Sequence, residues 1–142
     1  MIDHHLVHLA LRNRAASALP AAREYENVAF TPPAGAPYVE EDYVPATSEL
    51  RGLVKAGTVE DTAMYVLRWY GIAGQGTSAM NTGVQAILAL FRPGDRFTAT
   101  DGTVIRVRGD VAPTRSQIIN APDGRPVATV TIPIRVFHQN PA

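Results

Sequence analysis

VEDTAMYVLRWYGI, residues 59–72, is the longest strand candidate in the chain and decides what can be built around it. It is rich in the β-branched and aromatic residues that favour strands. Successive side chains of a strand point to opposite faces, and large apolar residues fall on both faces here. One face carries Met64, Val66 and Tyr70, and the other carries Tyr65, Leu67 and Trp69. We therefore expect both faces to be covered, by helices or by another subunit.

One helix is predicted on each side of this strand in the sequence. Apolar residues recur at helical spacing from residue 2 to about 18, and Pro20 ends that helix. The segment SAMNTGVQAILALF, residues 78–91, carries apolar side chains at three- and four-residue steps. Thr77 or Ser78 can cap its N-terminus, and Pro93 follows its end.

The last third of the sequence alternates strands and turns. Asp101-Gly102 predicts a tight hairpin between residues 95–100 and 103–110. Pro122-Asp123-Gly124 predicts a second turn, between residues 113–121 and the closing strand, residues 125–137. That closing strand alternates apolar and polar residues, which indicates one buried face. Pro133 cannot donate to a ladder, so we expect this strand at a sheet edge or beside a bulge.

The segment before the central strand is harder to interpret. YVEEDYVP, residues 38–45, predicts a short strand closed by Pro45, and residues 46–58 read as a long loop. Glu40 and Asp42 share one face of that short strand. A solvated edge explains this pair, and acid–base or metal chemistry is the alternative.

These elements predict an α+β fold: an antiparallel-rich mixed β-sheet with two α-helices packed on one face. The 142 residues suit a single domain spanning 1–142. Hydrophobic residues make up 46% of the chain and charged residues 18%, as in folded proteins.

Charge and motifs narrow the function classes. Thirteen basic and thirteen acidic side chains give a net charge of zero, which argues against tight electrostatic binding to DNA or membranes. The absence of cysteine excludes disulfides and thiolate chemistry. No signal peptide or membrane span is expected. The Gly-Gln-Gly at 74–76 lacks the lysine of a phosphate loop, so we expect no nucleotide or other cofactor.

Two small clusters are candidate sites. His4 and His8 lie four residues apart on one helix face, where they are either solvated or, with Glu40 and Asp42, the ligands of a metal-dependent enzyme or ligand-binding domain. Arg106 and Arg108 share a strand face, and Arg115 could join them in a small basic patch. Without interleaved aromatic residues this patch does not predict sequence-specific nucleic-acid binding, and we expect no catalytic residues.

ENVAFTPPAGAPYV, residues 26–39, is extended and resists helix formation because it is rich in proline. A segment with preset φ angles loses little entropy when it is fixed. It therefore suits an arm that lies against a neighbouring subunit. The alternative is an ordinary surface connection from the first helix to the sheet.

In this order the elements resemble the tail terminator proteins of long-tailed bacteriophages. The resemblance rests on ENVAFTPPAGAPYV, on YVLRWYGIAGQG leading into the second helix, and on FRPGDRFT before the Asp-Gly hairpin, and it spans about residues 2–137. The acidic EED at 40–42 and the segment 46–58 depart from the family pattern.

The resemblance implies a virion structural protein of the phage neck, assembled in the cytoplasm of the host bacterium. Such subunits form a six-membered ring that caps the tail tube, ends its polymerisation and offers a docking surface for the head. The implied partners are copies of the chain itself, the tail tube protein and the head–tail connector or stopper protein, while DNA passes through the channel without sequence-specific binding. A head-completion or connector subunit of the neck is the alternative in the same class. The expected interface residues are Phe30, Pro32, Pro33, Tyr38, Leu50, Leu53, Val54 and Trp69.

Overall fold

The computed structural model describes residues 2–20, 22–25, 28–51 and 58–139. Two helices and eight strands occupy them, as an α+β fold with a mostly antiparallel mixed sheet. The helices are α1 (His4–Ala15), extended by a 3₁₀ turn to Ala18, and α2 (Ser78–Leu90). The strands are β1 (Ala22–Glu24), β2 (Tyr38–Arg51), β3 (Thr58–Tyr70), β4 (Arg96–Thr98), β5 (Val104–Val107), β6 (Thr114–Arg115), β7 (Ile119–Asn120) and β8 (Pro126–Gln139).

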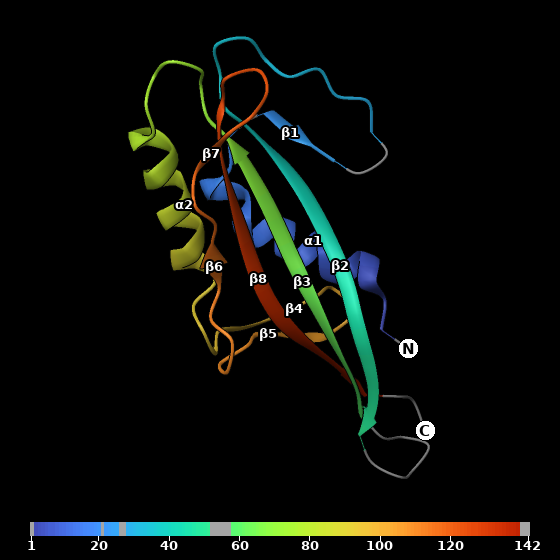
Figure 1. Cartoon of the computed structure of the whole chain (residues 1–142). Helices are drawn as coiled ribbons and strands as arrows, with labels where there is room; N and C mark the ends of the chain where they lie inside the picture. The colour runs from blue at the N-terminus through green and yellow to red at the C-terminus, as the bar shows by residue number, and fades with distance from the viewer. Residues whose placement is uncertain (1, 21, 26–27, 52–57, 140–142) are drawn as a thin grey trace.

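The sheet is built around three long strands. Its order is β1-β2-β3-β8-β5-β4, with β6 and β7 also paired to β8. Only the β1–β2 pairing is parallel among the described strands. Figure 1 shows β2, β3 and β8 side by side as the long central ribbon, with α1 passing behind it and α2 beside β8.

The predicted short strand and long loop at 38–58 are wrong. β2 continues to Arg51 and pairs with β3 along its whole length, so only 52–57 connect the two strands, and these lie outside the described residues. Pro45 does not end the strand, because the register shifts between Pro45 and Thr47. A bulge at that point tolerates the missing amide hydrogen.

Both helices pack on one face of the sheet, which we call the inner face. Val7, Leu11 and Ala15 of α1 are buried there, as are Met80, Val84 and Ile87 of α2. The inner face itself is lined by Tyr65, Leu67 and Trp69 of β3 and by the alternate residues of β8 from Ala128 to Val136. At roughly 25 cal/mol per Å² of apolar surface, this burial is the main favourable term in folding.

The hairpins in the last third are confirmed. β4 and β5 pair around Asp101-Gly102, where Gly102 has a φ of +87°, a conformation that glycine adopts without strain. Ile105 and Val107 are fully buried in the core. β6 and β7 return along β8, and the 122–124 turn has Gly124 at a φ of +84°.

β8 is not an edge strand, so the edge alternative for Pro133 is wrong. Pro133 lies instead where the neighbouring chain is interrupted between β5 and β6. β8 lies between β3 on one side and β5, β6 and β7 on the other. The Pro133 carbonyl accepts a 3.0 Å hydrogen bond from the Arg108 amide, just past the end of β5. Because the N and C=O of a strand residue face the same neighbour, the proline nitrogen points into the gap between β5 and β6. The missing donor therefore falls where the β5 ladder ends.

Candidate assembly surface on the outer sheet face

The face of the sheet opposite the helices, which we call the outer face, is largely open among the described residues. The strand registers place on it the even-numbered residues of β3, together with Tyr38, Glu40, Asp42 and Val44 of β2 and the odd-numbered residues of β8. Figure 1 shows this face toward the viewer, with the helices behind it or beside it. The sequence predicted that both faces of β3 would be covered. In the described part of this chain the two helices cover the inner face, and no helix covers the outer face.

The middle of the outer face is apolar or neutral. Val44 and Met64 are cross-strand neighbours, and their side chains are 42% and 38% exposed. Thr131 of β8 lies opposite Val66, and Pro133, which is buried, lies opposite Met64. Val44, Met64, Val66 and Thr131 form a band of uncharged surface across three strands, which is suited to contact with another protein.

The β1–β2 edge of the outer face carries carboxylates. Glu24 lies beside Glu40 across the parallel pair, and Asp42 follows on the same face. Arg68 of β3 binds both Glu40 and Asp42, the latter at 2.7 Å. Burial, followed by the charges of Glu40 and Asp42, raises the pKa of Glu24. Arg68 therefore binds two of these three carboxylates, and Glu24 lies beside them. We call Glu24, Glu40 and Asp42 the acidic edge.

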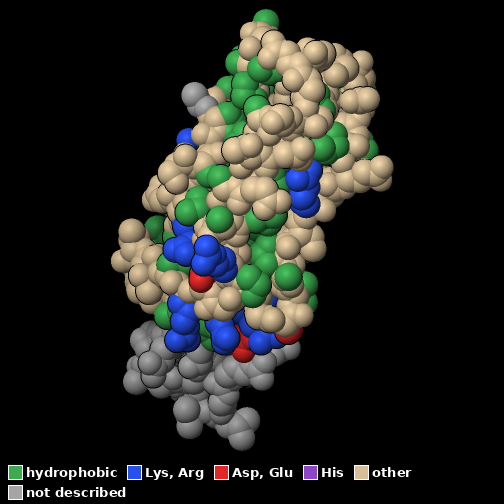
Figure 2. All heavy atoms as spheres, turned by 90° about the vertical axis from the view of Figure 1, so that its left-hand side faces the viewer, with side chains coloured by type: hydrophobic (Ala, Val, Ile, Leu, Met, Phe, Trp, Pro, Cys, Tyr) green, Lys and Arg blue, Asp and Glu red, His purple; other side chains and the backbone are tan. Residues whose placement is uncertain are grey.

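The opposite edge of the outer face carries arginines. Arg96, Arg106 and Arg135 are cross-strand neighbours on β4, β5 and β8. Arg108 adds a fourth guanidinium, and we call these four the basic edge. Seen from the side of α2, arginine side chains gather on the lower part of the molecule with few acidic ones among them (Figure 2).

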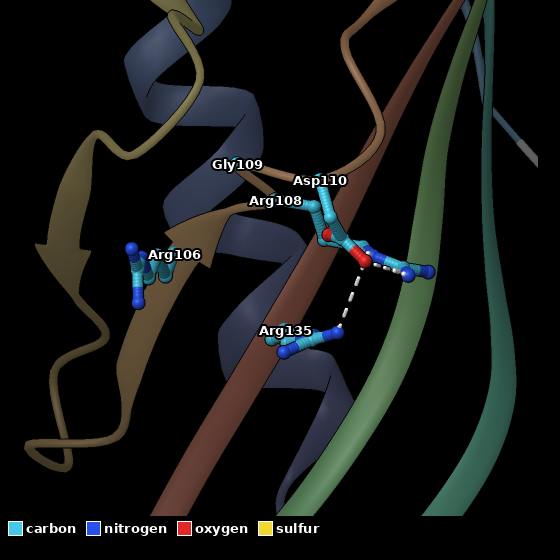
Figure 3. A pocket seen from close by; sticks show the side chains of 5 residues that line it. All are labelled: Arg106, Arg108, Gly109, Asp110 and Arg135. Carbon is cyan, nitrogen blue, oxygen red and sulfur yellow. Dashed lines mark hydrogen bonds and ion pairs between the residues drawn. The ribbon is translucent and has the colours of Figure 1, made fainter.

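A depression of about 430 Å³ lies among these arginines, lined by Arg106, Arg108, Gly109, Asp110 and Arg135. Asp110 accepts two hydrogen bonds from Arg108, at 3.0 and 2.7 Å, and one from Arg135 at 3.3 Å (Figure 3). The bonds from Arg108 lower the pKa of Asp110. Arg106 points away from this group, and within the described part of the chain no carboxylate pairs with Arg106 or Arg96. Arg115 does not join the cluster, because it donates to Asn81 of α2.

The Pro-rich segment lies over the outer face where β2 begins and β3 ends. Phe30 packs on Tyr38, with ring centroids 5.2 Å apart, and Tyr38 stacks on Tyr70 at 4.4 Å. Arg125, which is 8% exposed, donates to the carbonyls of Pro33 and Ala36. One buried guanidinium therefore holds the segment on its own sheet.

The expected interface residues occupy different environments. Pro32 is exposed, Phe30 and Pro33 are half-buried, and Tyr38 is buried under Phe30. Trp69 is 7% exposed on the inner face. Leu50 lies in β2, whereas Leu53 and Val54 lie outside the described residues.

A polar network on the inner face was missed by sequence reasoning. Glu41 is 2% exposed and accepts hydrogen bonds from Arg12 at 2.8 Å and from Tyr65 at 2.6 Å. His8 Nε2 lies 2.9 Å from the same carboxylate. Burial acts to raise the pKa of Glu41, but the neighbouring His8, Arg12 and Tyr65 groups hold it at about 2. Strand alternation was the available signal, because Glu41 must face away from Glu40 and Asp42.

The metal alternative does not fit this geometry. His4 binds the Asp61 carboxylate at 2.7 Å and the Tyr43 hydroxyl at 2.6 Å, and both histidines lie on the inner face. Glu40 and Asp42 lie on the outer face. The four side chains are therefore separated by the sheet, and neither histidine is simply solvated. Across residues 2–139, apart from the undescribed positions, no group of three His, Asp or Glu side chains could hold a metal ion.

The comparisons with known proteins come from sequence and from structure. A solved structure matches over 100% of both chains, at a TM-score of 0.73 and 19% sequence identity, which shows the shared fold alone. No curated protein matches the sequence. Neither helix of the described chain is long and apolar enough to cross a membrane. The profile of the family described as phage tail terminator protein matches residues 6–137. The chain therefore belongs to the phage tail terminator family and has a structural role in a phage tail.

Proposed function

We propose that this chain forms a closed ring, of six copies, that caps the tail tube, ends its polymerisation and provides the surface to which the head docks. The observation that carries the proposal is the open outer face of the three longest strands, in a chain whose family is a tail terminator. An uncharged band with exposed Val44 and Met64 supports burial by another protein.

A ring needs contacts of one kind between identical copies. A head-to-tail contact joins two different surfaces of the subunit, and it closes when the rotation between copies divides a full turn. The two edges of this sheet differ in length, charge and pairing, which supports a contact of this kind. The Pro-rich segment supports a second contact, because Pro32 is exposed and the residues around it are held in place by Arg125.

The channel of such a ring must let DNA pass. A net charge of zero supports this role, since a strongly basic lining would bind the phosphates and hold the genome back. The proposed location is the neck of the virion, after assembly in the host cytoplasm. The proposed partners are the tail tube protein and the head–tail connector or stopper protein.

The test adds purified protein to purified tail tubes and images the tube ends by negative stain. The expected result is a ring on one end of each tube and no further growth when tube subunits are added. A phage lacking the protein should produce overlong tails. Normal tails with unfilled or leaking heads would indicate a connector subunit instead, and tubes with bare, growing ends would contradict the proposal.

A further inference from the structure

Among the side chains that the structure describes, the two edges of the outer face carry opposite and balanced charge. At the acidic edge, Glu24, Glu40 and Asp42 face one arginine, Arg68, which leaves an excess of two negative charges. At the basic edge, the four arginines face two carboxylates, Asp110 and Glu60, which leaves an excess of two positive charges. The uncharged band separates the two edges.

We propose that the acidic edge of one copy binds the basic edge of the next, so that the partner of the arginine cluster is a second copy of this chain. The inference rests on the proposed ring and names the surfaces that close it. The pairs would join Glu24 or Glu40 to Arg96 or Arg106.

Self-association explains the matching opposite charges of the two edges better than an external partner does. A chain with no net charge and a basic edge must carry the compensating carboxylates elsewhere, and three of them lie on the same face of the same sheet. A two-fold contact made edge to edge would pair each edge with its own like and repel. A head-to-tail contact brings opposite edges together, and opposite patches also guide the encounter.

Both edges also have open backbone. β1 covers β2 only from Tyr38 to Glu40, so beyond Glu40 no described strand pairs with the outer side of β2. β4 ends the sheet at the other edge. Open edges accept further strands unless something covers them. Contact between copies at these edges would cover both.

Duplex DNA is the competing partner for the arginines. Two observations favour the second copy. Asp110 lies among the guanidiniums and would repel phosphate, and the acidic edge has no counterpart in a DNA site. The two partners are distinguished by the experiment.

The test reverses the charge of each edge separately. One variant carries Arg96→Glu with Arg106→Glu, two exposed arginines without an acidic partner in the described chain. The other carries Glu24→Lys with Glu40→Lys, which keeps Asp42 as the partner of Arg68. Arg92→Glu is the matched control, because Arg92 is exposed and lies after α2, off the sheet. Circular dichroism and thermal melts establish that each variant folds.

Sedimentation of each protein is measured with and without tail tubes, at low salt and at 1 M NaCl. Wild type and Arg92→Glu should associate, each charge-reversed variant alone should not, and an equimolar mixture of the two should associate again as an alternating ring. The association should weaken at 1 M NaCl, where the screening length falls to about 3 Å.

Each result has one meaning. If the charge-reversed variants associate like wild type, or if their mixture stays monomeric while wild type forms rings, the inference is overturned and the proposed function stands. If the mixture associates but no protein caps tubes, the contact is correct and the terminator function is wrong. If wild type stays monomeric even with tubes, both are overturned. If the Arg96→Glu, Arg106→Glu variant loses only binding to a labelled DNA duplex, the basic edge is assigned to DNA.

Discussion

The indole ring of Trp69 lies directly against the backbone of Gly83, so that a Cβ built on Gly83 would be 2.3 Å from the ring. Gly83 is in the middle of α2, where glycine costs about 1 kcal/mol relative to alanine. The contact with Trp69 explains why glycine occupies this position despite that cost. The absent side chain lets α2 lie close to β3.

Gly83→Ala should therefore destabilise the protein, although alanine is the better helix former. Forcing a methyl group into a packed core costs roughly 1–3 kcal/mol. The free energy of unfolding, from urea titration, should fall by about that amount. Gly109→Ala is the control, because nothing lies within 4 Å of a Cβ at that position. Equal stability of Gly83→Ala and wild type would show that the helix can move away without cost.

Glu41→Gln should destabilise the protein without changing its fold. The neutral amide would leave Arg12 without its carboxylate partner in a half-buried site, and breaking such a pair costs roughly 2–4 kcal/mol. Urea unfolding gives the difference. Asp42→Asn is the control, since its neighbour Glu40 still binds Arg68. A loss below about 0.5 kcal/mol would mean that the network contributes little.

The same carboxylate should make stability depend on acid pH. The pKa of folded Glu41 is about 2, below the ordinary value of 4.5, so its contribution is fully present above about pH 4.5. It is lost as the pH falls from 4.5 toward 2, because the unfolded chain takes up the proton first. The stability difference between wild type and Glu41→Gln should shrink across this window. A constant difference from about pH 6 to about pH 2.5 would contradict the assignment.

Arg125→Ala should release the Pro-rich segment while the sheet stays intact. The substitution removes the donors to the Pro33 and Ala36 carbonyls and the cation over the Tyr38 ring. Hydrogen bonds from charged groups contribute roughly 1.5–3 kcal/mol. Limited proteolysis within residues 28–36 should become at least about tenfold faster, since local opening controls cleavage. Arg92→Ala should be cleaved at the wild-type rate. An unchanged rate in Arg125→Ala would show that other contacts hold the segment.

Met64→Asp should abolish ring assembly and leave the isolated chain folded. Met64 is 38% exposed on the outer face, so a carboxylate is tolerated there when water surrounds it and is costly when a partner covers it. Tube-end images and sedimentation measure assembly, and thermal melts measure folding. Ala86→Asp, at an exposed position of α2 and away from the outer face, is the control. Normal rings from Met64→Asp would place the subunit contact away from this band.

Periodicity predicted most of the fold. The helical spacing of α2, the alternation in β8 and the Asp-Gly turn each depend on neighbours in the sequence, and each is confirmed. The length of β2 was missed because Pro45 and a polar stretch argue against a strand. Its pairing with β3 overrides both, through a bulge and a register that continues to Arg51. The position of β8 in the sheet could not be predicted, because Pro133 fits an edge or a bulge equally and strand order is not a local property.

The candidate surface was predictable only in part. Alternation places Glu40 and Asp42 on one face and Glu41 on the other, and this could have separated the ion pair with Arg68 from the buried network. Nothing local to Arg96, Arg106 and Arg135 indicates that they are neighbours. That arrangement follows from the pairing of β4, β5 and β8.

Pro133 lies on β8 between the part that pairs with β5 and the part that pairs with β6. β5 pairs with β8 on one side of it, β6 pairs on the other, and the excursion from Arg108 to Pro113 leaves the sheet between them. Residues can therefore be added to or removed from that excursion without shifting the register of either ladder. Since Asp110 lies on it, beside the arginines, a change in its length would alter the shape of the depression while the scaffold stays the same.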